Sequence, residues 1–220
     1  MSCAGGPDLI QDDLVLCLDA ANKKSYSGSG TIWRDISGNN NNGTLTNGPT
    51  FSSENSGSIV FDGTNDYIQC GNLSSMGITN DLTIEIWLQL INMSLNNYIT
   101  VFDTPQRSLS LWIGSQFYAI GKSSGSYSGN FNWQSNKWMY ICMKRTGTNT
   151  SIIKNNFEVS ASFTALGIDF NNNLEFGSNP SGGGTIFKGN MASIKLYKKA
   201  LTDTQILQNY NALKGRFQLT

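Results

Sequence analysis

The chain has 220 residues, enough for one large domain or two small ones with a substantial buried core. Its 15 basic and 15 acidic residues give zero net charge, so nucleic-acid binding, which depends on neutralising phosphates, is not expected. The absence of histidine excludes Ser-His-Asp triads and histidine-ligated zinc, and no apolar run approaches the roughly 20 residues that cross a bilayer.

Short apolar runs alternate with turn residues along almost the whole chain. The chain has 26 Asn, 26 Ser and 23 Gly, residue types that favour turns over helix interiors. Residues 82–91 alternate apolar side chains with Thr83, Glu85, Trp87 and Gln89, as in a strand with one buried face. We expect further strands at 14–18, 31–33, 58–61, 66–70, 98–102, 108–113, 117–120, 138–144, 150–154, 174–176 and 191–197, with turns or loops at 37–39, 47–49, 122–129, 171–173 and 181–184.

One helix is predicted near the end of the chain. Thr202 and Gln205 match a capping box, Ile206, Tyr210 and Leu213 then share one face, and Gly215 fits a left-handed C-terminal residue. The many short strands predict an all-β sandwich, against which this helix docks. We expect one domain over residues 14–216, with an N-terminal arm at 1–13 and a C-terminal tail at 217–220 that serve attachment.

Four segments resemble the laminin-G-like, concanavalin-A-like lectin/glucanase family. They are the F-D-G-x-x-D-Y strand-turn-strand within 58–68, the tryptophan-containing strand 82–88, the hairpin 137–156 and the closing strand and helix start at 187–202. The resemblance implies a concanavalin-A-like jelly-roll β-sandwich with one short C-terminal helix. It also implies two possible activities, because the family contains both lectins and glycosidases.

Residues 14–22, 31–39, 42–45 and 208–217 are similar to a subgroup of this family found in structural proteins of tailed-bacteriophage virions. In that subgroup the domain sits on tail fibres or on the outer head surface. The resemblance therefore implies a virion location, with capsid or tail proteins as partners. No secretory signal is visible in residues 1–8, which agrees with a particle-associated protein, and the low charge and Asn/Ser loops fit a homo-oligomer.

The sequence favours a non-catalytic protein. The family's hydrolases carry an E-x-D-x-x-E strand, which is absent here, and Glu85 stands alone on a strand face that we expect to be solvated. Calcium is the cofactor that the resemblance implies, and Asp103, at the end of a strand, is the candidate rim ligand. Asp62 and Asp66 are interpreted as capping a tight turn.

Glycan binding needs an aromatic platform beside amide and hydroxyl groups. The candidate glycan-binding residues are Tyr127, Asn130, Phe131, Asn132 and Trp133 in one polar stretch, together with Trp87. The alternatives are that Phe131 and Trp133 pack beneath their loop and that Trp87 packs the second face of its sheet. Trp112 and Trp138 are expected in the core. The four cysteines lack zinc-site spacing, and Cys17 and Cys142 are predicted to be buried thiols.

The leading hypothesis is a lectin-like virion protein, acting in head decoration or in adhesion by a tail or fibre through glycans. The alternatives are a cellular carbohydrate-binding protein, a glycoside hydrolase that uses Glu85 or Glu175, and a cement protein without a ligand.

Overall fold

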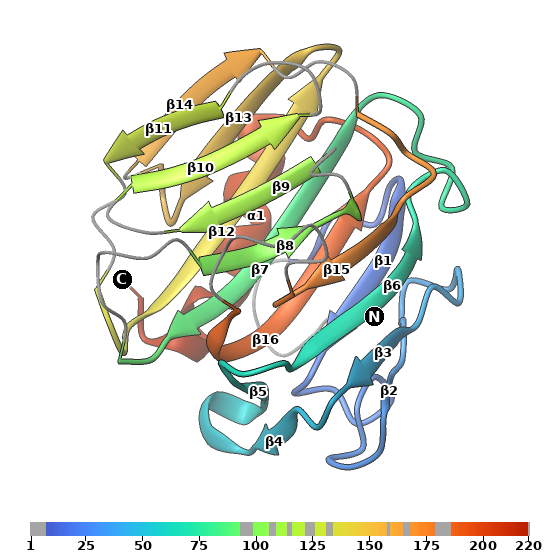
Figure 1. Cartoon of the computed structure of the whole chain (residues 1–220), viewed down its shortest axis with the longest axis vertical. Helices are drawn as coiled ribbons and strands as arrows, with labels where there is room; N and C mark the ends of the chain where they lie inside the picture. Colours follow the sequence, from blue (N-terminus) through green and yellow to red (C-terminus); the bar gives the residue numbers. More distant parts are fainter. Residues whose placement is uncertain are drawn as a thin grey trace.

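A computed structural model describes residues 8–92, 99–105, 109–113, 116–121, 126–130, 134–157, 159–164, 168–178 and 186–219, with the backbone alone described at 116–121, 126–130 and 159–163. Two antiparallel sheets, sheet A and sheet B, lie face to face, and one helix lies behind sheet A (Figure 1). The prediction of an all-β sandwich with a short C-terminal helix is confirmed. None of the described helices has the length and apolar character of a membrane span.

The back sheet, sheet A, is built around strand β16. Its strands are, in spatial order, β14 (Val159–Thr164), β13 (Asn149–Lys154), β12 (Trp138–Thr146), β7 (Leu82–Leu90), β16 (Lys188–Tyr197), β5 (Ser58–Asp62) and β4 (Thr50–Ser52). Strand β1 (Leu14–Asp19) also pairs with β16, at residues 193–197, while β5 pairs with residues 188–191. Strand β16, near the C-terminus, therefore pairs with the first strand of the chain as well as with β5.

The front sheet, sheet B, has the order β11 (Ser126–Asn130), β10 (Gln116–Gly121), β9 (Leu109–Ile113), β8 (Ile99–Asp103), β15 (Asn173–Phe176), β6 (Tyr67–Asn72), β3 (Gly43–Thr46) and β2 (Ile32–Trp33). Neighbours such as β8, β15 and β6 are far apart in sequence, so long-range pairing decides which residues lie side by side. Strands β3, β4 and β14 were not predicted, and β11 occupies part of the stretch 122–129 that was expected to be a loop.

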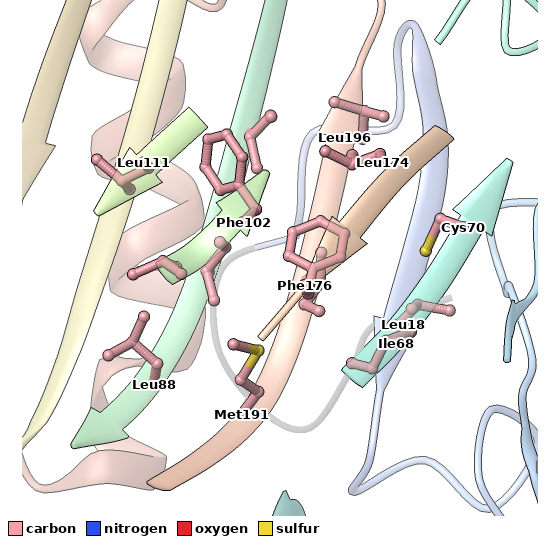
Figure 2. Packing of buried hydrophobic residues seen from close by; sticks show 14 of the residues in the cluster. Leu18, Ile68, Cys70, Leu88, Phe102, Leu111, Leu174, Phe176, Met191 and Leu196 are labelled. Atoms are coloured by element: carbon pink, nitrogen blue, oxygen red, sulfur yellow. The ribbon is translucent and has the colours of Figure 1, made fainter. Parts of the chain in front are cut away.

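The main hydrophobic core fills the space between the two sheets. Leu88, Met191 and Leu196 of sheet A meet Ile68 and Phe176 of sheet B there (Figure 2). All the apolar residues that alternate along β7, from Leu82 to Leu90, belong to this core, which confirms the predicted inner face of that strand.

A second hydrophobic cluster covers the other face of sheet A. The helix α1 (Asp203–Leu213) and the following turn η3 (Lys214–Phe217) place Tyr210 and Phe217 on Trp87 of β7. The Trp87 ring stacks on both, with centroid distances of 5.6 Å to Tyr210 and 4.4 Å to Phe217. Sheet A is thus the middle layer of three.

The ends of α1 only partly follow the prediction. The capping box is present, since Thr202 Oγ1 accepts from the Gln205 N–H at 3.3 Å and Gln205 Oε1 accepts from the Thr202 N–H at 3.0 Å. Gly215 is not the left-handed terminator, because the chain continues through η3 and Gln218 takes that conformation, with φ 57°. Continuing through Gly215 brings Phe217 onto Trp87.

The described parts of the expected arm and tail pack against the domain. Leu9 and Phe217 are buried in the second cluster, and Ile10 and Leu219 pack against it. The Ile10 N–H donates to Asn209 Oδ1 at 2.9 Å. Residues 8–13 and 217–219 therefore contribute to the packing of the helix on sheet A.

The segments that resemble virion proteins meet at the edge of β1 that faces away from β16. Asp35 Oδ1 accepts from the Cys17 N–H at 2.8 Å, and the side-chain amides of Asn39 and Asn41 donate to the carbonyls of Leu14 and Val15 at 3.0 and 2.7 Å. Side chains thus satisfy backbone groups that a neighbouring strand would otherwise pair. Asp35, Asn39 and Asn41 therefore have a structural role.

We predict that Trp87→Ala lowers the free energy of unfolding by about 3–5 kcal/mol, because it leaves a cavity beneath α1. Urea unfolding followed by far-ultraviolet circular dichroism measures the loss. Ile32→Ala is the control, since Ile32 is 42% exposed and its truncation should change stability by less than about 0.5 kcal/mol. Equal losses in the two variants would contradict the three-layer arrangement.

Candidate functional site

The outer face of sheet A is closed to ligands in the region of β7. Trp87 is 0% exposed and Glu85 is 1% exposed, both beneath α1. The prediction of Trp87 as a glycan-binding residue is therefore corrected in favour of its alternative, packing on the second face of the sheet. The expectation that Glu85 is solvated is also wrong, because the helix covers the alternating positions that would otherwise face water.

Glu85 belongs to a buried polar network that ties α1 to the sheet. Asn209 Nδ2 lies 2.9 and 3.1 Å from the two carboxylate oxygens of Glu85 and 2.9 Å from Tyr197 Oη. Tyr197 donates in turn to the Ile10 carbonyl at 3.1 Å. Burial raises the pKa of Glu85, against the opposing effects of Lys195 on the paired strand and of the Asn209 hydrogen bond. The network is structural and has no access for a substrate.

The outer face of sheet B carries a row of polar side chains across five strands. Cross-strand pairing joins Thr44 to Gln69, Gln69 to Glu175 and Glu175 to Asp103, and the Asp103 carboxylate accepts a hydrogen bond from Ser110. We call these five residues the polar row. Thr44 and Gln69 are exposed and Glu175 is half-buried, whereas Asp103 and Ser110 are buried. The row therefore runs from the solvent into the protein.

Hydrogen bonds hold the two carboxylates of the polar row in place. Glu175 Oε1 accepts from Gln69 Nε2 at 3.4 Å, and Glu175 Oε2 accepts from the Ser178 hydroxyl. Asp103 Oδ1 accepts from the Thr104 N–H at 2.8 Å as well as from Ser110. These bonds orient Gln69 at the exposed end of the row and fix Asp103 at its buried end.

The proposed metal ligand Asp103 does not fit a calcium site at the rim of the protein. Its side chain is 0% exposed, and its Oδ1 already accepts two hydrogen bonds. Calcium takes six to eight oxygen ligands, yet the described residues contain no group of three acidic, Cys or His side chains that could hold a metal. The described residues therefore do not assemble a calcium site around Asp103.

Aromatic residues accompany the polar row on the same sheet. Trp112 alternates with the core residues Leu111 and Ile113 and is 7% exposed, so it is buried as predicted but outside both hydrophobic clusters. Its cross-strand neighbours are Thr100 on β8 and Tyr118 on β10. Trp138, in contrast, is a member of the second cluster, which confirms it as a core residue.

The predicted glycan-binding stretch falls on the edge of sheet B. Tyr127 stands opposite Ala119, which in turn stands opposite Leu111, while Asn130 stands opposite Gln116. Phe131, Asn132 and Trp133 lie outside the described residues. The sheet therefore brings the strand that holds Tyr127 and Asn130 into the same layer as the polar row.

Two smaller predictions are confirmed. Asp62 Oδ1 accepts from the Thr64 N–H at 2.7 Å and Asp66 Oδ2 accepts from the Asp62 N–H at 2.9 Å, so both caps belong to a turn. The Thr64 bond lowers the pKa of Asp62. Cys17 and Cys142 are buried, and burial raises the pKa of the Cys142 thiol well above its usual value.

A family profile for the concanavalin A-like lectin/glucanases superfamily matches residues 62–207. The chain belongs to this superfamily. No curated protein matched its sequence. The expected concanavalin-A-like fold and laminin-G-like domain are thereby confirmed, and the match spans strands of both sheets and the first turns of α1.

Several solved structures have a similar fold but low sequence identity to this chain. Trypanosoma rangeli sialidase in complex with sialic acid has a TM-score of 0.72 at 11% identity, over 93% of this chain and 33% of that one. Domain 4 of an extracellular arabinanase from Geobacillus stearothermophilus, in complex with arabinotriose, has a TM-score of 0.69 at 16% identity, over 90% and 98%. The receptor-binding domain of botulinum neurotoxin type G has a TM-score of 0.65 at 16% identity, over 90% and 51%. The chain thus spans a third of the sialidase and nearly all of the arabinanase domain.

We predict that Glu85→Gln changes how stability depends on pH. Because the folded protein raises the pKa of Glu85, the stability that this group contributes is fully present below its unfolded pKa and is lost as pH rises through the folded value. The free energy of unfolding of the wild type relative to the variant should therefore fall by up to about 1.4 kcal/mol per pH unit on going from acid to neutral pH.

Urea titrations at successive pH values measure this difference. Glu54→Gln, at an exposed position, is the matched control and should show no such slope. If the difference in free energy of unfolding between the wild type and the variant stays constant with pH, the raised pKa of Glu85 in the folded protein is contradicted.

Proposed function

We propose that this chain is a non-catalytic glycan-binding domain that binds through the outer face of sheet B. The observation that carries the proposal is the polar row, which starts at exposed Thr44 and Gln69 and continues through Glu175. Amide, hydroxyl and carboxylate groups that are already oriented can exchange hydrogen bonds with sugar hydroxyls at a low cost in ordering.

The layered arrangement of the fold favours the outer face of sheet B as the binding surface. Helix α1 and the chain ends cover sheet A around Trp87, so in that region a ligand meets the helix rather than the strands. Trp112 lies two residues from Ser110 of the polar row on β9, and the strand that holds Asn130 belongs to the same sheet. The solved arabinanase domain, which this chain covers almost completely, holds arabinotriose and supports carbohydrate as the ligand class.

A glycoside hydrolase is the second candidate, and the pairing of Asp103 with Glu175 favours it. Retaining glycosidases hold two carboxyl groups about 5–5.5 Å apart, on either side of the bond that they cleave. Asp103 is fully buried and hydrogen-bonded, however, so it cannot reach a glycosidic bond without a rearrangement. This burial supports binding without hydrolysis, and no metal is needed for it.

We further propose that the domain works on the outside of a tailed-bacteriophage particle, as a homo-oligomer attached to capsid or tail proteins. The support is the resemblance of residues 14–22, 31–39, 42–45 and 208–217 to virion structural proteins. These segments form one structural unit, since Arg216 Nη1 lies 2.8 Å from Asp19 Oδ1. The glycans would be those of a host or environmental surface.

We predict saturable binding to oligosaccharides that the double variant Thr44→Ala/Gln69→Ala weakens about tenfold, because two hydrogen-bonding groups are lost. A glycan array that includes arabinotriose identifies a ligand, and calorimetric titration of the strongest one measures the affinity. Thr50→Ala/Asn80→Ala, at exposed positions away from the polar row, is the matched control and should bind as the wild type does.

The same samples separate the rival functions. Release of reducing ends by the wild type would establish a hydrolase, and absence of binding to every glycan would favour the cement protein. Binding that disappears with a chelator and returns with calcium would contradict the metal-free proposal.

We predict that the protein sediments with virions in a gradient of infected-cell lysate, and that immunogold labels the particle surface. Label on the head would indicate decoration, and label on the tail or fibres would indicate adhesion. Glycan binding by a protein that stays at the top of the gradient would instead favour the cellular carbohydrate-binding alternative.

A further inference from the structure

A basic pocket lies next to the exposed end of the polar row. Residues 23–34 line an open surface pocket of about 220 Å³ that contains three cations, Lys23, Lys24 and Arg34. The remaining lining is formed by Ser25, Ser27, Ser29, Gly30, Thr31 and Ile32. No acidic side chain contributes to it, although the whole chain has no net charge.

The pocket is a built feature of the fold. The Arg34 N–H donates to the Ser25 carbonyl and the Tyr26 hydroxyl donates to the Gly30 carbonyl, both at 2.8 Å. The buried Tyr26 ring packs on Phe51 with a centroid distance of 5.7 Å. These contacts close the segment on itself, so an incoming ligand meets a pocket that is already formed.

The positive charge of the pocket is not neutralised from within the described part of the chain. The ion pairs there do not include Lys23, Lys24 or Arg34. The acidic residues of neighbouring segments are engaged elsewhere, since Asp19 pairs with Arg216 and Asp35 accepts backbone N–H groups of Cys17 and Ser37. The three cations are therefore available to an external anion.

The pocket and the polar row form one continuous track. Ile32 lines the pocket and, as the first residue of β2, stands directly opposite Thr44 of the row. From β2 to β8 the sheet order is β2-β3-β6-β15-β8, and four strand spacings of about 4.8 Å make roughly 19 Å. The accessible part of the track runs from the cations at the edge strand through Thr44 and Gln69 to the half-buried Glu175, so its two ends differ in charge.

We propose that the pocket is the subsite for an acidic sugar, so that the glycan which this domain recognises is an acidic oligosaccharide carrying carboxylate or sulfate groups. Arg34 can form two parallel hydrogen bonds with a carboxylate or sulfate, and the lysines add charge. The hydroxyl groups of the same chain then extend along Thr44 and Gln69. This inference rests on the proposed glycan-binding function and names the chemical class of its ligand.

The test compares ligands that differ only in charge. Oligogalacturonate is titrated beside the same oligomer with its carboxyl groups reduced to alcohols, and a sulfated galactan oligomer beside its desulfated form. We expect one acidic member to bind at least about tenfold more tightly than its neutral partner, with the difference shrinking at high salt. A preference in the first pair assigns the anion as carboxylate, and in the second as sulfate.

A pair of variants locates the effect. Lys24→Gln/Arg34→Gln should abolish the preference for the acidic oligomer and leave the neutral one unchanged. Lys137→Gln/Lys188→Gln removes the same charge at exposed positions outside the pocket and should retain the preference. Thermal unfolding checks that both variants are folded.

The outcomes distinguish the two proposals. Equal binding of acidic and neutral oligomers, or equal losses in both double variants, would overturn the acidic subsite while leaving glycan binding intact. Absence of binding to all four ligands and to the array would overturn the glycan-binding function itself, and the subsite with it.

Discussion

The stacking of Trp87 between the sheet and the C-terminal aromatic residues is the constraint on which the arrangement of the molecule depends. Tyr210 and Phe217 lie nearly parallel to its ring, at 13° and 16°. This contact commits the outer face of sheet A to packing, and it draws in the chain ends as well, through Leu9 and the turn after α1. Recognition is thereby left to sheet B, whose outer face carries the polar row.

A buried ion pair between Arg216 and Asp19 holds the C-terminal turn against the first strand. Arg216 pairs with Asp19 and also donates to the carbonyls of Asn55 and Gly57, so one side chain joins the first strand, the last turn and the segment before β5. Breaking such a pair leaves a buried charge without compensation, which is costly. Arg216 and Asp19 thus maintain the fold.

Charge separates the two ends of the proposed binding face. Asp103 and Glu175 lie toward the buried end of the polar row, and Lys23, Lys24 and Arg34 surround the pocket at the edge strand. In a chain of zero net charge, the proposed binding of an acidic glycan would depend on this local cluster of cations and not on the charge of the whole protein.

Local patterns in the sequence determined the strand-rich class, the inner face of β7, the capping box at Thr202 and the turn at Asp62, because each depends on residues close together in the chain. Tertiary structure alone decided that Glu85 and Trp87 are buried, since the helix that covers them begins more than a hundred residues later. It also decided the polar row, because Gln69, Glu175 and Asp103 become neighbours only through pairing between strands far apart in sequence. A period-two pattern shows which residues share a face, but the layer that covers that face is chosen by the packing of the whole chain.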